Sequence, residues 1–194
     1  MSLLGPEPQA YPDHLFQLSV TAAPWWVLYV RARQEKKLAR RLVEEQVPFY
    51  LPQQEKRALI SGKQRVSYLP LFPGYVFLRG DRAERLAAVR SNLIVHTLEV
   101  LDQDRLHCEL GNLWALQQAG LPLVPIPYLE PGDEVEIREG PFAGYRGQIV
   151  RLKGTDRLVV SITFLRRSVA AEMDRGAVRL QAPSRPRELH RVPA

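Results

Sequence analysis

The residues that could perform catalysis or bind a metal are few and scattered. The chain holds one cysteine, Cys108, and four histidines, His14, His96, His107 and His190. A lone cysteine permits neither an intrachain disulfide nor a cluster of thiol ligands. His107 precedes Cys108, but neighbours in a helix point about 100° apart, so two unrelated helix residues are a simpler interpretation than a nucleophile and its base. We therefore expect no catalytic site, no bound metal and no cofactor.

The segment Leu71–Phe77 has the residue types of a binding surface. It contains a Pro-Gly break followed by a strand in which Tyr75 and Phe77 lie two residues apart. Glycine permits a bend, and alternate residues of a strand share a face. Aromatic rings on one face can form the core or dock a partner, and the residue pattern alone favours the core. A tyrosine hydroxyl prefers a polar neighbour, so Tyr29 and Tyr75 are the better candidates for exposure.

Positive charge is the second property that suggests a partner. Lys and Arg number 27 against 21 Asp and Glu, which gives a net charge of +6. This balance favours an anionic partner, nucleic acid first, although a basic protein without such a partner has the same composition. Much of the charge lies on a helix predicted over Arg31–Val47, whose apolar face carries Leu38 and Leu42. The basic face of that helix is either solvated or in contact with phosphates.

The elements that position these residues follow from the hydrophobic period. The predicted strands are Trp25–Val30, Phe49–Leu59, Val66–Leu69, Val76–Arg79 and Leu93–Val100, and the predicted helices are Arg31–Val47, one capped by Asp81 and one begun by Asp102 or Asp104. The strands Phe49–Leu59 and Val66–Leu69 are predicted to form a hairpin with a basic tip around Gly62. The order β-α-β-β-β-α-β-α predicts an α+β sandwich, with helices against one face of one sheet.

Proline and glycine divide the chain into five parts. We expect a flexible N-terminal extension over residues 1–23, a first domain over 24–120, a Pro-rich linker over 121–128, a second domain over 129–181 and a flexible tail over 182–194. The second domain has short β-branched strands between Gly-containing turns, which predicts a small five-stranded β-barrel. The first 23 residues have neither the basic start nor the apolar core of a secretory signal, and we expect neither such a signal nor a membrane-spanning helix. The single cysteine suits a reducing cytoplasm, where we expect the protein to act.

Three motifs in order resemble the NusG family of transcription elongation factors. They are Trp26–Tyr29, then Leu71–Phe77, then the series that begins Glu130-Pro131-Gly132-Asp133 and continues through Gly140–Gly144 to Gly147–Val150. The last is similar to a KOW motif. The resemblance covers about residues 24 to 180. It implies an NGN-type α/β sandwich, an antiparallel sheet with helices, followed by an SH3-like KOW barrel.

The resemblance also implies partners. In this family, which is not enzymatic, the N-terminal domain binds the clamp helices of the largest RNA polymerase subunit and suppresses pausing or termination. The aromatic residues that match the polymerase-binding surface are Tyr29, Phe72, Tyr75 and Phe77. The KOW domain recruits a small-subunit ribosomal protein or a termination factor, and Phe164 matches an apolar position at which it meets such partners. Packing within a hairpin is the alternative for Phe164.

Residues 47–52 and 70–73 are similar to those of specialised paralogues of the RfaH type, which regulate transcription antitermination. The resemblance places Arg31, Arg41 and Arg90 on the surface that reads non-template DNA there. RfaH has a C-terminal domain that can refold as helices, but the glycines at 140, 144, 147 and 154 predict a β-barrel in every state here. The alternative function is that of a general nucleic-acid-binding or ribosome-associated KOW protein.

Overall fold

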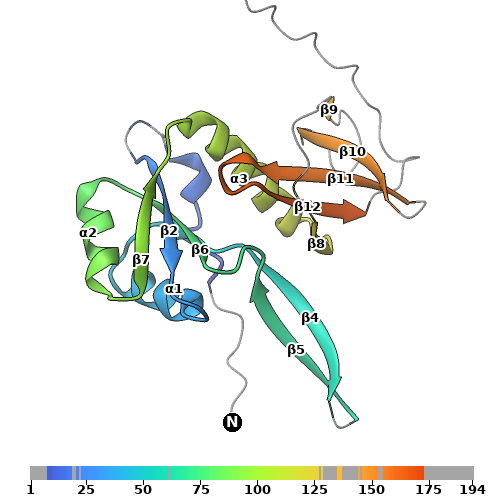
Figure 1. Ribbon diagram of the computed structural model, residues 1–194, viewed down its shortest axis with the longest axis horizontal. Helices are drawn as coiled ribbons and strands as arrows, with labels where there is room; N and C mark the ends of the chain where they lie inside the picture. Colours follow the sequence, from blue (N-terminus) through green and yellow to red (C-terminus); the bar gives the residue numbers. More distant parts are fainter. Residues whose placement is uncertain are drawn as a thin grey trace, which may run out of the picture.

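A five-stranded antiparallel sheet forms the centre of the first domain. The computed structural model describes residues 8–18, 21, 23–60, 62–126, 128, 135–136, 144, 146–152 and 155–172. The strand order in the sheet is β1-β3-β6-β2-β7. The strands are β1 (Ala10–Tyr11), β2 (Trp25–Val30), β3 (Phe49–Tyr50), β6 (Tyr75–Arg79) and β7 (Ile94–Glu99). The predicted α+β sandwich with an antiparallel sheet is confirmed (Figure 1).

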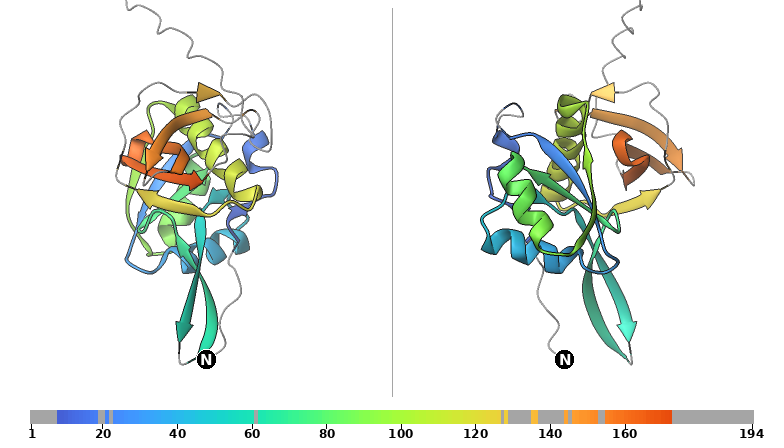
Figure 2. Two further views of the ribbon diagram at one scale, coloured as in Figure 1. Left: turned by 90° about the vertical axis from the view of Figure 1, so that its right-hand side faces the viewer. Right: turned by 60° about the vertical axis from the view of Figure 1, so that its left-hand side comes forward.

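Helices cover both faces of this sheet, not one face as expected. Alternate residues of the central strands point to opposite sides, and residues of both sets, such as Val27 and Leu28, are fully buried. Leu28 packs with α1 (Glu35–Glu44) and α2 (Arg82–Arg90), whereas Val27 packs with α3 (Gln103–Gln118). The ribbon views show these helices around the sheet (Figures 1 and 2). Because both faces of the sheet are apolar, each must pack against a helix, and this is why the helices lie on both faces and not on one.

The helix starts follow the sequence signals. Asp81 caps α2 by accepting a hydrogen bond from the Ala83 N–H, and Glu84 bonds back to the Asp81 N–H. Asp102 caps α3 by accepting from the Arg105 N–H. Each cap satisfies backbone donors that the first helical turn leaves without partners. The predicted beginnings of both helices are confirmed.

A long two-stranded hairpin projects from the first domain. It consists of β4 (Gln53–Ile60) and β5 (Lys63–Pro70), which form a sheet of their own. The hairpin points away from the two packed sheets and their helices in every view (Figures 1 and 2). The strand expected over Phe49–Leu59 is thereby split into β3 and β4. Pro52 lies between them, and because proline has no N–H to continue a ladder, the chain leaves the central sheet there.

The N-terminal segment departs from the flexible extension that we expected over residues 1–23. β1 pairs with β3, and the side chain of Leu15 is fully buried. The buried guanidinium of Arg79 donates hydrogen bonds to the carbonyl oxygens of Leu15 (3.1 Å) and Ala23 (2.9 Å). Hydrogen bonds offset the cost of burying a charge, and this segment supplies the acceptors for Nε and Nη1. Residues 1–7 lie outside the described residues.

The second sheet contains five strands in the order β8-β12-β11-β10-β9. They are β8 (Leu123–Ile126), β9 (Val135–Glu136), β10 (Arg146–Leu152), β11 (Thr155–Ile162) and β12 (Arg167–Glu172). The expected β architecture is confirmed, while its closure as a barrel stays a prediction. Strand β8 lies within the segment expected to be a linker. Its Pro125 is tolerated because β8 pairs only with β12, at the edge of the sheet. The expected tail over 182–194 lies outside the described residues.

The second sheet packs on α3. Leu106, Leu110 and Leu113 of the helix belong to the same buried cluster as Leu158 and Val160 of β11. The helix α3 therefore packs against both the central sheet and the second sheet. The helix connects the two domains through apolar contact, and the connection from its end at Gln118 to β8 is short.

Candidate functional site

The Pro-Gly turn before β6 is fixed by contacts from two other elements. Gly74 has φ +85°, a conformation that favours glycine. Its N–H donates to Oε1 of Glu35 (2.8 Å), at the start of α1, and its carbonyl accepts from the Val30 N–H (2.8 Å), at the end of β2. A Cβ on residue 74 would lie 3.2 Å from Cε2 of Tyr29. The turn therefore sets the position of the Tyr29 ring.

Tyr29 is an exposed member of a small aromatic group. Its side chain lies at the end of β2 and the residue is 41% exposed. The Tyr75 ring lies 5.5 Å away, centroid to centroid, and the His96 ring stacks at 6.5 Å with an interplanar angle of 10°. These three residues are paired across β6, β2 and β7, so the sheet register places them in a row. Rings held by neighbours lose little freedom when a partner binds.

Tyr29 borders a cavity of about 570 Å³ between β2, the start of α1 and the base of the β4–β5 hairpin. We call it the Tyr29 cavity. It is lined by Tyr29, Val30, Ala32, Arg33, Glu35, Lys36, Gln54, Tyr68, Leu69, Pro70, Pro73 and Gly74. The walls are largely apolar, and the Glu35 carboxylate is engaged by Gly74. Arg33 and Lys36 add positive charge to the lining. A concave apolar wall with a few cations suits a protein segment that carries acidic residues.

The four predicted docking residues separate into two groups. Tyr29 lines the cavity, and Tyr75 is half-buried beside it. Phe72 is 3% exposed and Phe77 fully buried, and their rings meet edge to face at 6.2 Å. The strand period correctly placed Tyr75 and Phe77 on one face. Phe77 belongs to the core beneath the aromatic group, so it supports the surface and is not part of it.

Several cavity residues escaped the sequence interpretation. Tyr68, Leu69 and Pro70 come from the base of β5, which folds back beside β2. Their local sequence pattern does not predict this position, because β5 and β2 are far apart in the chain. Glu35 had a detectable signal, since it is the one acidic residue among the basic residues at the start of α1.

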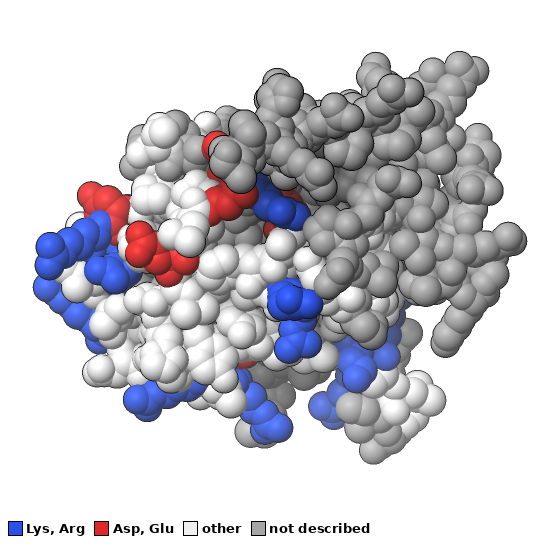
Figure 3. Space-filling view, turned by 45° about the horizontal axis from the view of Figure 1, so that its top comes forward, with Lys and Arg blue, Asp and Glu red and all other residues white. Residues whose placement is uncertain are grey.

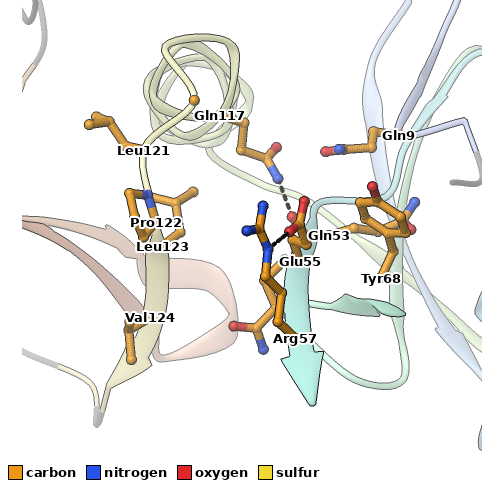
Figure 4. Close-up of a pocket in the computed structure, with 12 residues that line it drawn as sticks. Gln9, Gln53, Glu55, Arg57, Tyr68, Gln117, Leu121, Pro122, Leu123 and Val124 are labelled. Atoms are coloured by element: carbon orange, nitrogen blue, oxygen red, sulfur yellow. Dashed lines mark hydrogen bonds and ion pairs between the residues drawn. The ribbon is translucent and has the colours of Figure 1, made fainter. Parts of the chain in front are cut away.

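A second hollow, of about 600 Å³, lies on the other side of the hairpin base (Figure 4). Residues 121–124, which lead into and begin β8, form one wall, and Gln53, Glu55 and Arg57 of β4 form the other. Nε2 of Gln117 crosses from α3 to donate to the Gln53 carbonyl (2.7 Å), and the same side chain accepts from the Tyr50 hydroxyl. The base of the hairpin is thus anchored to α3 and flanked by a hollow on each face.

The three predicted nucleic-acid residues, Arg31, Arg41 and Arg90, are all exposed. The Arg31 N–H donates to the Leu93 carbonyl (2.9 Å), which brings the end of β2 near the chain that follows Arg90. Arg41 lies on α1 and forms an ion pair with Glu45 (2.7 Å). On the face in Figure 3, Lys and Arg stand in separate groups divided by uncharged surface. That face has no single continuous basic patch.

Phe164, the predicted KOW contact, lies beside the first domain. It belongs to a short 3-10 helix, Thr163–Leu165, and is 37% exposed. It lines a hollow of about 280 Å³ together with Leu101 and Glu109. Glu109 of α3 accepts hydrogen bonds from the Thr163 N–H (2.9 Å) and from its hydroxyl (2.6 Å). The loop that carries Phe164 is therefore tied to α3.

Metal ligands do not gather anywhere in the part of the chain that the structure describes: no three His, Cys, Asp or Glu side chains are placed to share an ion. Within the same residues, no helix combines the length and hydropathy that crossing a bilayer requires.

Comparison with known proteins identifies the family. The family profile described as "Transcription termination factor nusG" matches residues 23–103, and the profile described as "KOW motif" matches residues 131–162. Among solved structures, "Domain interaction in Thermotoga maritima NusG" is similar, with 17% identity, a TM-score of 0.43 and coverage of 79% of this chain and 94% of that one. No protein with curated annotation matches. The matched segments include the strands and the Pro-Gly turn around Tyr29. The chain belongs to the NusG family of transcription elongation and termination factors, which are not enzymes, and carries an NGN domain followed by a KOW motif.

Proposed function

We propose that this protein binds RNA polymerase through the Tyr29 cavity and suppresses pausing or termination while bound. The observation that carries the proposal is the exposed Tyr29 ring at the edge of an apolar cavity, with Tyr75 and His96 beside it. Aromatic anchors beside pockets provide much of the energy of protein interfaces. The partner segment is the tip of the clamp helices in the largest polymerase subunit, because a helix tip can present apolar residues to such a hollow.

The charges around the cavity agree with this partner. Arg33 and Lys36 line the cavity, and neither forms an ion pair with another described residue. Cations at the border of an interface mainly raise the association rate with an acidic partner. Phe72 and Phe77 take part indirectly, by fixing β6 and therefore the Tyr75 ring.

The three arginines and Phe164 extend the proposal to further partners. Arg31 and Arg90 lie in segments joined by the Arg31–Leu93 hydrogen bond, and they contact the phosphates of non-template DNA in the bound state. Arg41 adds a third such contact on α1. Phe164 receives a small-subunit ribosomal protein or a termination factor once its loop is free of Glu109.

The similarity of residues 47–52 and 70–73 to RfaH-type paralogues supports a specialised role in antitermination. In that role the chain acts in the cytoplasm on selected transcription units, with an NGN domain over 24–120 and a KOW domain over 129–181. A run-off assay on a template with a terminator measures this directly. Read-through that rises with added protein supports the role, and unchanged read-through contradicts it.

The docking proposal is tested by Tyr29→Ala in a co-purification and titration assay with cognate RNA polymerase. Loss of a central aromatic anchor costs about 2 kcal/mol or more, so affinity should fall by about thirtyfold. Val95→Ala is the matched control, because Val95 is similarly exposed on the neighbouring strand β7 but does not line the cavity. Equal affinities for the two variants would contradict docking at this cavity.

A further inference from the structure

The β4–β5 hairpin has two chemically different faces. In an antiparallel pair, residues directly opposite one another share a face. The strand register therefore places Lys56 with Ser67, and Arg65 with Ala58, on one side of the ribbon. Lys63, two residues before Arg65 on the same strand, lies on that side as well. We call this side the cationic face.

The opposite side is mixed and already neutralised. Arg57 lies there opposite Val66, and Glu55 lies there opposite Tyr68. Arg57 and Glu55 form an ion pair with each other. Exposed Leu59 completes this side, which at its base borders the hollow beside β8 (Figure 4). The mixed face therefore offers little net charge to an anionic partner.

The charged side chains of the cationic face are free to bind an anionic partner. Lys56, Lys63 and Arg65 are all exposed, and within the described residues none of them forms an ion pair. The face contains no acidic residue. Solvated lysines are common on protein surfaces. Here, however, every charge on one face of the hairpin is positive, and the only acidic residue of the hairpin, Glu55, forms its ion pair on the other face. Such segregation fits a phosphate backbone.

The two-stranded form of the hairpin favours DNA over an RNA duplex as the nucleic acid. Strands rise about 3.4 Å per residue, so Lys56 and the position of Lys63 are about 14 Å apart along the ribbon. The major groove of B-form DNA is about 12 Å wide and admits a two-stranded β-ribbon. The major groove of an RNA duplex is too deep and narrow to admit one. The hairpin also projects free of the body, as insertion requires (Figure 2).

We propose that the cationic face of the β4–β5 hairpin binds duplex DNA, with the ribbon along the major groove and Lys56, Lys63 and Arg65 on backbone phosphates. Gln54 and Leu69 belong to the same face and line the Tyr29 cavity, so the DNA-binding face and the cavity adjoin. The placement of this contact on the template duplex beside polymerase rests on the proposed function. DNA binding by the free protein does not.

The first experiment measures binding of the full chain to a fluorescent 20-base-pair duplex as a function of salt. Three phosphate contacts contribute a slope of about −2.7 in log K against log salt, or about fortyfold weaker binding between 50 and 200 mM salt. Lys56→Gln should reduce the slope by about one. Arg57→Gln is the matched control, since it removes the same charge one residue away on the mixed face. It should change the slope little, and equal effects of the two variants would overturn the proposal.

The second experiment locates the duplex on the hairpin. In a Cys108→Ser background, a photo-crosslinker attached through Ser67→Cys on the cationic face should label DNA, whereas one attached through Val66→Cys on the mixed face should not. Labelling from both positions overturns the assignment of one face. An RNA duplex of the same sequence that binds as tightly, with the same dependence on Lys56, overturns the choice of DNA. Tyr29→Ala should leave DNA binding intact, so failure of this proposal and failure of polymerase docking are distinguishable.

Discussion

Glu35 accepts a buried hydrogen bond from the backbone N–H of Gly74, and the two residues are 39 positions apart in the chain. The contact joins the first turn of α1 to the turn that begins β6. Tyr29 lies directly against that turn. The position of the exposed ring therefore depends on an ion-to-backbone contact that no local pattern contains.

Glu35→Ala should destabilise the fold by about 1–3 kcal/mol, because the substitution leaves the buried Gly74 N–H without an acceptor. Glu35→Gln keeps an oxygen in place and should lose less. Urea unfolding of each variant checks this, as a shift in the midpoint at constant m value. Unchanged midpoints for both variants would show that the Gly74 N–H finds another partner.

Gly74→Ala should destabilise the fold by about 1–2 kcal/mol, since a side chain at φ +85° is strained. The added Cβ would also press on the Tyr29 ring at 3.2 Å, so polymerase affinity should fall in the folded variant. Gly62→Ala is a control with a positive φ but open space around the added carbon. It should cost similar stability and leave the affinity for polymerase unchanged.

Substitutions of Tyr29 and Phe77 should distinguish a residue that binds polymerase from one that stabilises the fold. Phe77→Ala removes a fully buried ring from the core and should cost about 3–5 kcal/mol of stability. Tyr29→Ala removes a ring that is largely outside the core, so its midpoint should move far less. Thermal unfolding beside polymerase titration compares the two. A Tyr29→Ala variant as unstable as Phe77→Ala would mean that the ring is structural.

The central strands and the helix caps were predictable because their signals are local. The alternation in Tyr75–Phe77, and the caps at Asp81 and Asp102, need only neighbouring residues to be recognised. The cavity was not predictable in the same way, since Tyr29 and Tyr68 come together only through tertiary folding. The tyrosine hydroxyl indicated Tyr29 as a candidate for exposure, but no local signal showed that Phe72 is buried.

The N-terminal segment and β8 differ from expectation for a related reason. Both are rich in proline and lack a hydrophobic period, so they were interpreted as flexible or as linker. Leu15 and Leu123 are nevertheless buried in the core, and their segments are held by a hydrogen bond from Arg79 to the Leu15 carbonyl and by pairing of β8 with β12. A short segment can add an edge strand or a cap to a core without a pattern of its own.

His107 should make stability depend on pH. Burial and the nearby Arg79 charge lower the pKa of His107 below its usual value of about 6.5. Between the two values the unfolded chain binds more protons, so stability is complete above about pH 6.5 and decreases as pH falls through the folded pKa. Nδ1 accepts from the Trp25 indole (3.3 Å), which requires the unprotonated ring. The urea midpoint of the protein should fall as the pH is lowered from 7.5 to 5. His107→Gln should make the midpoint depend less on pH. If the midpoint of the variant falls equally with pH, another titrating group causes the dependence.

Glu109 should protect one particular amide in the second domain. Its carboxylate accepts from both the N–H and the hydroxyl of Thr163, and Arg105 holds it in place from the preceding turn (3.0 Å). Glu109→Ala should therefore increase hydrogen exchange at Thr163 and at neighbouring Phe164, while the apolar contact of α3 with β11 keeps the two domains together. Glu99→Ala is the matched control, since Glu99 lines the same hollow without bonding Thr163. Faster exchange through all of β11 and β12 would instead mean that this one carboxylate holds the whole second sheet on α3.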